Sequence, residues 1–133
     1  MATIKSYTDL EQSKKLAEIL PIEAADAIYP WRELIKDYDS VYVPEDMSDI
    51  REEDIPCWSL AALLNVMPKD EGIDCSLSFG YYDGKGEYIE KWLCAFEKEG
   101  ESTDDYIIET IDGDNPVDAC VTMIERLHKL NLL

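Results

Sequence analysis

The sequence predicts a single α+β domain over residues 1–133, in which a three-stranded antiparallel meander packs against a buried central helix and N- and C-terminal helices. Three observations predict this class. An apolar tract runs from Cys57 to Met67, alternating strand-like segments follow it, and a well-capped amphipathic segment closes the chain. With 133 residues, 46% of them hydrophobic, the chain is long enough to bury a core without disulfide or metal support.

The first helix is predicted from the stretch TDLEQSKKLAEILP. Thr8 is expected to cap it, Glu11 to complete a capping box, and Pro21 to end it. Residues 22–53 carry weaker signals. They predict a short helix around Trp31 to Lys36, a short strand in SVYVP, and a solvated loop in EDMSDIREED.

The central helix is predicted from the stretch DIPCWSLAALLNVMP. Pro56 suits the first helical turn, and Pro68 prevents the helix from continuing. Only Ser59 and Asn65 are polar between Cys57 and Met67, so we expect a helix that is covered on most sides. At 1.5 Å per residue the tract spans about 16 Å, too short for a bilayer core of about 30 Å.

Three strands should follow. CSLSFGYYD alternates Cys75, Leu77, Phe79 and Tyr81 with smaller or polar residues, which is typical of a half-buried strand. DGKG then makes a turn, and further strands are expected over residues 87–96 and 105–111. Tight turns between consecutive strands predict an antiparallel meander with one drier face and one wetter face.

The last helix has the clearest signals. Asn115 is expected to cap it, Pro116 to occupy its first turn, and Asp118 to lie favourably at its positive end. Its inward face is predicted to consist of Val117, Cys120, Val121, Ile124, Leu127 and His128.

Cys57 is the main candidate for catalytic chemistry in the sequence. A cysteine followed by Trp at a helix start resembles the nucleophile of papain-like cysteine hydrolases. However, the only histidine is His128 in the last helix, and EEDIP replaces the family's oxyanion segment. A cysteine hydrolase is therefore a distant third hypothesis, and no catalytic residue is assigned.

Metal and cofactor chemistry has little support in the sequence. The four cysteines have no zinc-like spacing, and we expect them to be small buried hydrophobic residues. The stretch DGDN lacks the later ligands of a calcium loop and is better explained as a helix cap. We therefore expect neither a bound metal nor a cofactor.

Charge gives the main functional signal. The net charge of −18 argues against direct binding of nucleic acid, because such binding needs a basic surface. There is no N-terminal signal sequence and no membrane span, so we expect a cytoplasmic location. Two acidic runs form the candidate partner-binding surface, which would attract a protein with a basic face. Its residues are Glu45, Asp46, Asp49, Glu52, Glu53, Asp54, Glu97, Glu99, Glu101, Asp104 and Asp105.

The blocks DIPCWSLAALLNVMP and DNPVDACVTMIERLHKLNLL resemble those of short, acidic, uncharacterised proteins encoded in prophages and conjugative elements of gut bacteria. This resemblance implies a genomic setting and no mechanism. The leading hypothesis is thus a small, non-catalytic protein-interaction accessory of a mobile element. The alternative is a DNA mimic that inhibits a restriction or CRISPR enzyme.

Overall fold

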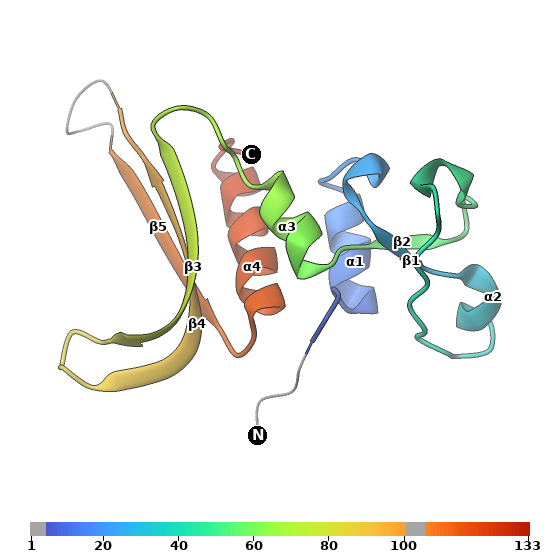
Figure 1. Cartoon of the computed structure of the whole chain (residues 1–133), viewed down its shortest axis with the longest axis horizontal. Coiled ribbons are helices and arrows are strands. Elements are labelled where there is room, and N and C mark those ends of the chain that lie inside the picture. Colours follow the sequence, from blue (N-terminus) through green and yellow to red (C-terminus); the bar gives the residue numbers. More distant parts are fainter. Residues whose placement is uncertain (1–4, 101–105) are drawn as a thin grey trace. The chain divides into compact units, whose positions relative to one another are not determined.

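The computed structural model describes residues 5–100 and 106–133. Within them lie four α-helices, a three-stranded antiparallel sheet and a two-stranded sheet, so the mixed α and β class is confirmed (Figure 1). No helix in these ranges is both long and apolar enough to cross a bilayer. With η marking a 3₁₀-helix, the elements are α1 (Leu10–Ala17), η1 (Ile22–Ala24), β1 (Ala27–Tyr29), α2 (Trp31–Leu34), η2 (Met47–Asp49), β2 (Ile55–Cys57), α3 (Leu60–Val66), β3 (Ile73–Tyr82), β4 (Tyr88–Lys98), β5 (Ile107–Gly113) and α4 (Pro116–Lys129).

The chain divides into two compact units. One runs from Ser6 to Val66, and the other combines the N-terminus up to Lys5 with Met67–Leu133. They are called the N-terminal unit and the sheet unit below. The single domain expected from the sequence stays a prediction.

The sheet unit is a meander with α4 on one face (Figure 1). β3 pairs antiparallel with β4, β4 pairs antiparallel with β5, and α4 contacts both β4 and β5. Cys94 and Phe96 alternate along β4 and are buried, with Cys94 against Cys120 of α4. The predicted three-stranded antiparallel meander is therefore confirmed.

The regular alternation of β3 breaks near its end. The sequence placed Phe79 and Tyr81 on one face, but the pairing with β4 shifts between these two residues. Gly80 lies at the shift with a φ of 82°, and an added Cβ would meet the Tyr88 hydroxyl at 1.8 Å. Phe79 keeps the alternation, opposite Trp92, whose ring centre lies 5.4 Å from its own, although it is 52% exposed. The Tyr81 hydroxyl donates to Asp112 at 2.7 Å, and Asp112 pairs with Leu93, which is out of phase with the buried Cys94. The expected face is therefore wrong for Tyr81, because the irregular pairing re-aims the side chains that follow it.

α4 begins as predicted. The Asn115 side chain accepts a hydrogen bond from the Asp118 backbone N–H at 2.9 Å, and Pro116 opens the helix. The position of His128 was predicted wrongly, because its side chain is exposed. It lies about 20° around the helix from Val121 and about 40° from Ile124, so it is on the apolar side, but it falls in the last turn, where Lys129 and Leu130 are exposed as well. The buried residues of α4 are Val117, Ala119, Cys120, Val121, Met123, Ile124 and Leu127.

In the N-terminal unit, the cap of α1 lies one residue later than predicted. The Asp9 carboxylate accepts from the Gln12 N–H at 2.8 Å, and the Gln12 side chain accepts from the Asp9 N–H at 3.0 Å. This is the reciprocal arrangement of a capping box, formed by these two residues instead of Thr8 and Glu11.

Thr8 serves as a buried junction instead. Its hydroxyl accepts from the Trp58 backbone N–H at 3.1 Å and lies 2.7 Å from the Ser13 hydroxyl. Its carbonyl accepts from the Tyr29 hydroxyl at 2.7 Å, and burial is the main reason that the pKa of Tyr29 rises to about 12. Thr8 thereby links the start of α1 to β1 and to the end of β2. Its hydroxyl is used in these contacts and does not cap the helix.

The predicted central helix is two elements. β2 ends at Cys57, and α3 begins only at Leu60. Asp26 accepts hydrogen bonds from both the backbone N–H and the hydroxyl of Ser59, and the Ser59 hydroxyl accepts from the Ala62 N–H at 3.2 Å. Ser59 therefore caps α3. The expectation of a helix covered on most sides is wrong, since only Ala62 and Leu63 of α3 are buried and Leu64 is 38% exposed.

Pro56 occupies β2, opposite Ile28 of β1. The N–H of Ile28 donates to the Tyr42 carbonyl, and the N–H of Tyr42 donates to the Ile28 carbonyl, both at 2.9 Å. The polar groups of Ile28 thus point away from β2, and by the same antiparallel geometry the missing N–H of Pro56 faces away from β1. Proline is tolerated there, whereas the sequence analysis placed it in a helical turn.

Residues 22–53 agree only in part with prediction. α2 is shorter than the helix expected up to Lys36, and of the predicted strand SVYVP only Tyr42 forms a β-bridge. The expected loop contains η2 and is largely exposed.

Candidate functional site

A groove of about 470 Å³ lies within the N-terminal unit. It forms where β1 and α2 meet the segment 42–54, and all its lining residues belong to this one unit. The lining residues are Ile28, Pro30, Trp31, Arg32, Tyr42, Pro44, Glu45, Asp46, Asp49, Ile50, Arg51 and Asp54. The groove combines apolar and charged side chains, which is typical of a binding site.

Asp54 holds two sides of the groove together. One carboxylate oxygen accepts from the Trp31 backbone N–H and the other from the Arg51 backbone N–H, each at 2.9 Å. Asp54 is half-buried, so its role is to position the start of α2 against the loop. Asp54 was predicted to belong to the partner-binding surface, and it lies in the groove lining with its carboxylate accepting from two backbone N–H groups.

Aromatic side chains make the apolar part of the groove. Trp31 is half-buried, and the guanidinium carbon of Arg51 lies 5.9 Å from the centre of its ring, within cation–π range. Tyr42 is 57% exposed, but its backbone is held by the two hydrogen bonds to Ile28, which is 5% exposed. The groove therefore offers fixed aromatic surface to solvent.

Acidic side chains of the predicted surface complete the lining. Glu45, Asp46 and Asp49 line the groove and are exposed. The backbone N–H of Ser48 donates to the Asp46 carboxylate at 2.9 Å, and this hydrogen bond lowers the pKa of Asp46. Together with Asp54 they give the lining four carboxylates. The lining also has two guanidinium groups, those of Arg32 and Arg51, so its net charge is negative.

The remaining predicted acids lie elsewhere. Glu52 and Glu53 are exposed next to the groove residues in sequence but do not line the groove. Glu97 and Glu99 belong to the sheet unit, and that the two acidic runs form one surface stays a prediction. Glu101, Asp104 and Asp105 lie outside the described residues.

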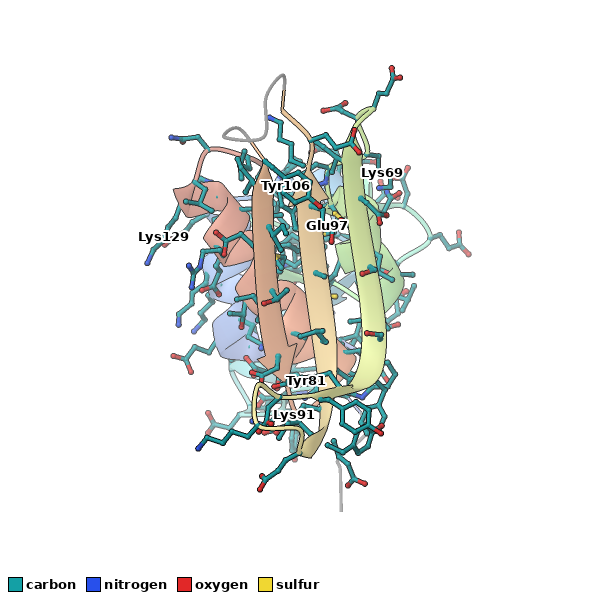
Figure 2. The ribbon with its side chains drawn as sticks, turned by 90° about the vertical axis from the view of Figure 1, so that its left-hand side faces the viewer. Lys69, Tyr81, Lys91, Glu97, Tyr106 and Lys129 are labelled. Atoms are coloured by element: carbon teal, nitrogen blue, oxygen red, sulfur yellow. The ribbon has the colours of Figure 1, made fainter. Side chains whose placement is uncertain are left out.

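Glu97 has a partner on the open face of the sheet. The Tyr106 hydroxyl donates to its carboxylate at 3.0 Å, as the side chains in Figure 2 indicate. This hydrogen bond is the main cause of the raised pKa of Tyr106. The pair links β4 to the start of β5, so this carboxylate has a cross-strand contact as well as exposure to solvent.

Cys57 lacks the surroundings of a nucleophile. It lies in β2 and not at a helix start, and it is 0% exposed. Burial, with a smaller effect of the Asp26 charge, raises its pKa to about 12, so the thiol stays protonated near neutral pH. The structure thus removes the helix-start position on which the cysteine hydrolase hypothesis rested.

The other cysteines are also free thiols. Cys94 and Cys120 are buried and Cys75 is half-buried. A hydrogen bond between Cys94 and Cys120 lowers the pKa of Cys94 and raises that of Cys120. In residues 5–100 and 106–133, no group of three His, Cys, Asp or Glu side chains has the geometry to hold a metal ion.

The chain matches no protein-family model, no curated protein and no solved structure. Its function must therefore be inferred from the groove itself.

The aromatic half of the groove was missed by sequence reasoning. Trp31 and Tyr42 lie in the region with the weakest helix and strand signals, and they meet the acidic loop through Asp54, which is 23 residues from Trp31. The pattern Tyr-Pro-Trp before a short helix was a usable signal, because it sets a rigid aromatic at a helix start.

Proposed function

We propose that this chain is a small, non-catalytic cytoplasmic protein that binds a protein partner with a basic surface through the groove of the N-terminal unit. We propose further that it serves a mobile element, a setting that rests on the resemblance of two sequence blocks alone. The observation that supports binding is the placement of three exposed carboxylates beside exposed aromatic surface in one groove.

Charge and shape act together in this proposal. Glu45, Asp46 and Asp49 would attract a basic partner over a distance of about a Debye length, and the net charge of −18 would add to this attraction. Trp31 and Tyr42 would then supply the apolar contact that slows dissociation, as aromatic residues commonly do in interfaces.

The composition of the groove favours a protein ligand over mimicry of DNA. A mimic needs carboxylates repeated along a surface like phosphates along a duplex. Here the acids share the lining with Arg32 and Arg51, and the Asp54 carboxylate accepts hydrogen bonds from two backbone N–H groups. Protection of phage against restricting hosts would support the DNA-mimic alternative and argue against the groove proposal.

The test is capture of a partner by a groove variant. Wild-type protein is compared with the triple variant Glu45→Gln, Asp46→Asn, Asp49→Asn in affinity purification from the native host. We expect one or a few proteins with the wild type, weakened by raising the salt concentration and lost with the triple variant.

A matched control removes the same charge from the sheet unit. The variant Glu71→Gln, Glu87→Gln, Glu90→Gln changes three exposed carboxylates that do not line the groove. It should capture the partner as the wild type does. Equal capture by the groove variant, or equal loss with both variants, would contradict a role of the groove.

A further inference from the structure

This inference rests on the proposed function and concerns the conformation of the bound segment. The mode of recognition depends on which backbone groups a groove leaves available and on the shape of its side chains. Both are visible in the N-terminal unit.

Addition of a β-strand is disfavoured at this groove. β1 is paired with β2 on one side, and Ile28 exchanges two hydrogen bonds of 2.9 Å with Tyr42 on the other. β1 thus has no free edge at Ile28. On the outer side of β2, Pro56 has no N–H to offer a partner strand.

The apolar surface is short and interrupted by charge. A bound amphipathic helix needs an apolar strip that meets positions i, i+3, i+4 and i+7. Here Arg32, Arg51 and three exposed carboxylates stand among the apolar side chains of a groove of about 470 Å³. A narrow ligand without internal hydrogen bonds fits this surface better than a helix does.

The apolar side chains of the groove include flat aromatic rings on a held backbone. Trp31 and Tyr42 are joined in the lining by Pro30 and Pro44, whose rings fix the backbone on both sides of the groove. Aromatic-lined grooves of this kind suit a polyproline II segment, which is already extended and therefore loses little conformational entropy on binding. Three residues of such a segment span about 9 Å.

The acidic side chains set the charge of the ligand. Glu45, Asp46 and Asp49 are exposed beside the aromatic residues, and the hydrogen bond from Ser48 lowers the pKa of Asp46. A guanidinium group of the ligand could bind such carboxylates in two-point contacts. We propose that the groove binds a proline-rich segment in the polyproline II conformation, with an arginine next to the prolines.

Three labelled peptides test this proposal by fluorescence anisotropy at low salt. The first is a Pro-x-x-Pro peptide flanked by arginines, the second has each proline replaced by alanine, and the third has each arginine replaced by glutamate. We expect the first to bind at least tenfold more tightly than either of the others.

Variants locate the peptide. Tyr42→Ser removes an exposed ring while leaving the backbone bridge to Ile28, and it should weaken binding of the first peptide about tenfold. The triple variant Glu45→Gln, Asp46→Asn, Asp49→Asn should also cost about tenfold, and the sheet-unit control variant should cost nothing. Circular dichroism verifies that each variant is folded.

The outcomes separate this inference from the proposed function. Equal binding of the alanine peptide would overturn the polyproline II assignment while leaving a basic partner in place. Equal binding of the glutamate peptide would overturn the charge assignment, and with it the basic partner. If no peptide binds, the inference is wrong, and the affinity purification decides the proposed function independently.

Discussion

Replacement of Thr8 by valine should measure the buried junction of the N-terminal unit. Thr8 and Ser13 are both 0% exposed, and the Thr8 hydroxyl contacts Ser13 at 2.7 Å and the Trp58 N–H at 3.1 Å. Valine keeps the shape of threonine and removes both hydrogen bonds, so the change isolates the hydroxyl.

The expected loss of stability comes from the polar groups that lose a hydrogen-bond partner. The Trp58 N–H would lose its acceptor in a buried place, which costs about 1–3 kcal/mol. Ser13 keeps a longer contact of 3.4 Å with the Thr8 carbonyl, so its share is smaller, roughly 0.5–1 kcal/mol. The added methyl returns at most about 0.8 kcal/mol. The free energy of unfolding should therefore fall by about 2 kcal/mol.

Urea unfolding followed by tryptophan fluorescence measures this change. Trp31 and Trp58 lie in the N-terminal unit and Trp92 in the sheet unit, so a Trp92→Phe background reports on the N-terminal unit alone. The midpoint should fall by roughly 1 M. Ser40→Ala, which removes an exposed hydroxyl in the same unit, should change the unfolding free energy by less than about 0.5 kcal/mol.

A loss below about 0.5 kcal/mol for Thr8→Val would refute the reasoning, because it would mean that the Trp58 N–H finds another acceptor. The double variant with Ser13→Ala gives a second check. Its loss should be smaller than the sum of the two single losses, since the two hydroxyl groups share one hydrogen bond.

Three further predictions concern other parts of the molecule. Gly113→Ala should lower the thermal stability of the sheet unit by about 1–3 kcal/mol, because the new Cβ would lie 2.9 Å from the Ala119 backbone nitrogen; unchanged melting would contradict this packing. Cys57 has a pKa raised to about 12 in the folded state against 9.0 for an ordinary thiol, so its contribution to stability is complete below pH 9 and is lost as the pH rises towards 12. Urea midpoints from pH 8 to 12 should fall less steeply in Cys57→Ala than in the wild type, and parallel curves would exclude this linkage. Asp54→Ala should lower the free energy of unfolding in urea by about 1–3 kcal/mol, because two backbone N–H groups lose their acceptor. Glu53→Ala should lower it by less than about 0.5 kcal/mol. Equal effects of the two variants would show that the hydrogen bonds of Asp54 do not stabilise the fold.

The sheet unit was well predicted from sequence because its signals are local. Alternation along β3 and β4 and the turn at residues 83–86 depend on neighbouring residues, as does the cap of α4 by Asn115. The misplaced side chains, Tyr81 and His128, lie after a shift in strand pairing and in the last turn of a helix. The local pattern continues at both places, but the strand pairing or the covering element changes.

The N-terminal unit was poorly predicted because distant residues decide its local structure. Ser59 starts α3 since it is held by Asp26, which lies 33 residues earlier, and Pro56 enters a strand that pairs with Ile28. Thr8 had the right residue type for a cap, but its hydroxyl is committed to Trp58, 50 residues away. No periodicity reveals such long-range hydrogen bonds.

Only the acidic half of the candidate site was predicted from the sequence. Exposed acids at Glu45, Asp46 and Asp49 follow from charge alone, since such a run is rarely buried. The aromatic half needed the fold, because Trp31 meets the acidic loop through Asp54 and Arg51, which lie 23 and 20 residues away in sequence. Asp54 also lines the groove, with its carboxylate engaged by two backbone N–H groups that no sequence pattern reveals.

The clamp made by Asp54 has a kinetic consequence. Asp54 joins the backbone at Trp31 to the backbone at Arg51, so the loop between them is already closed in the free protein. The conformational entropy of closing this loop is therefore lost on folding and not on ligand binding. A preorganised receptor of this kind should associate in a single fast step, without a slow phase of loop ordering. Stopped-flow traces should then be monophasic, with an observed rate that rises linearly with ligand concentration.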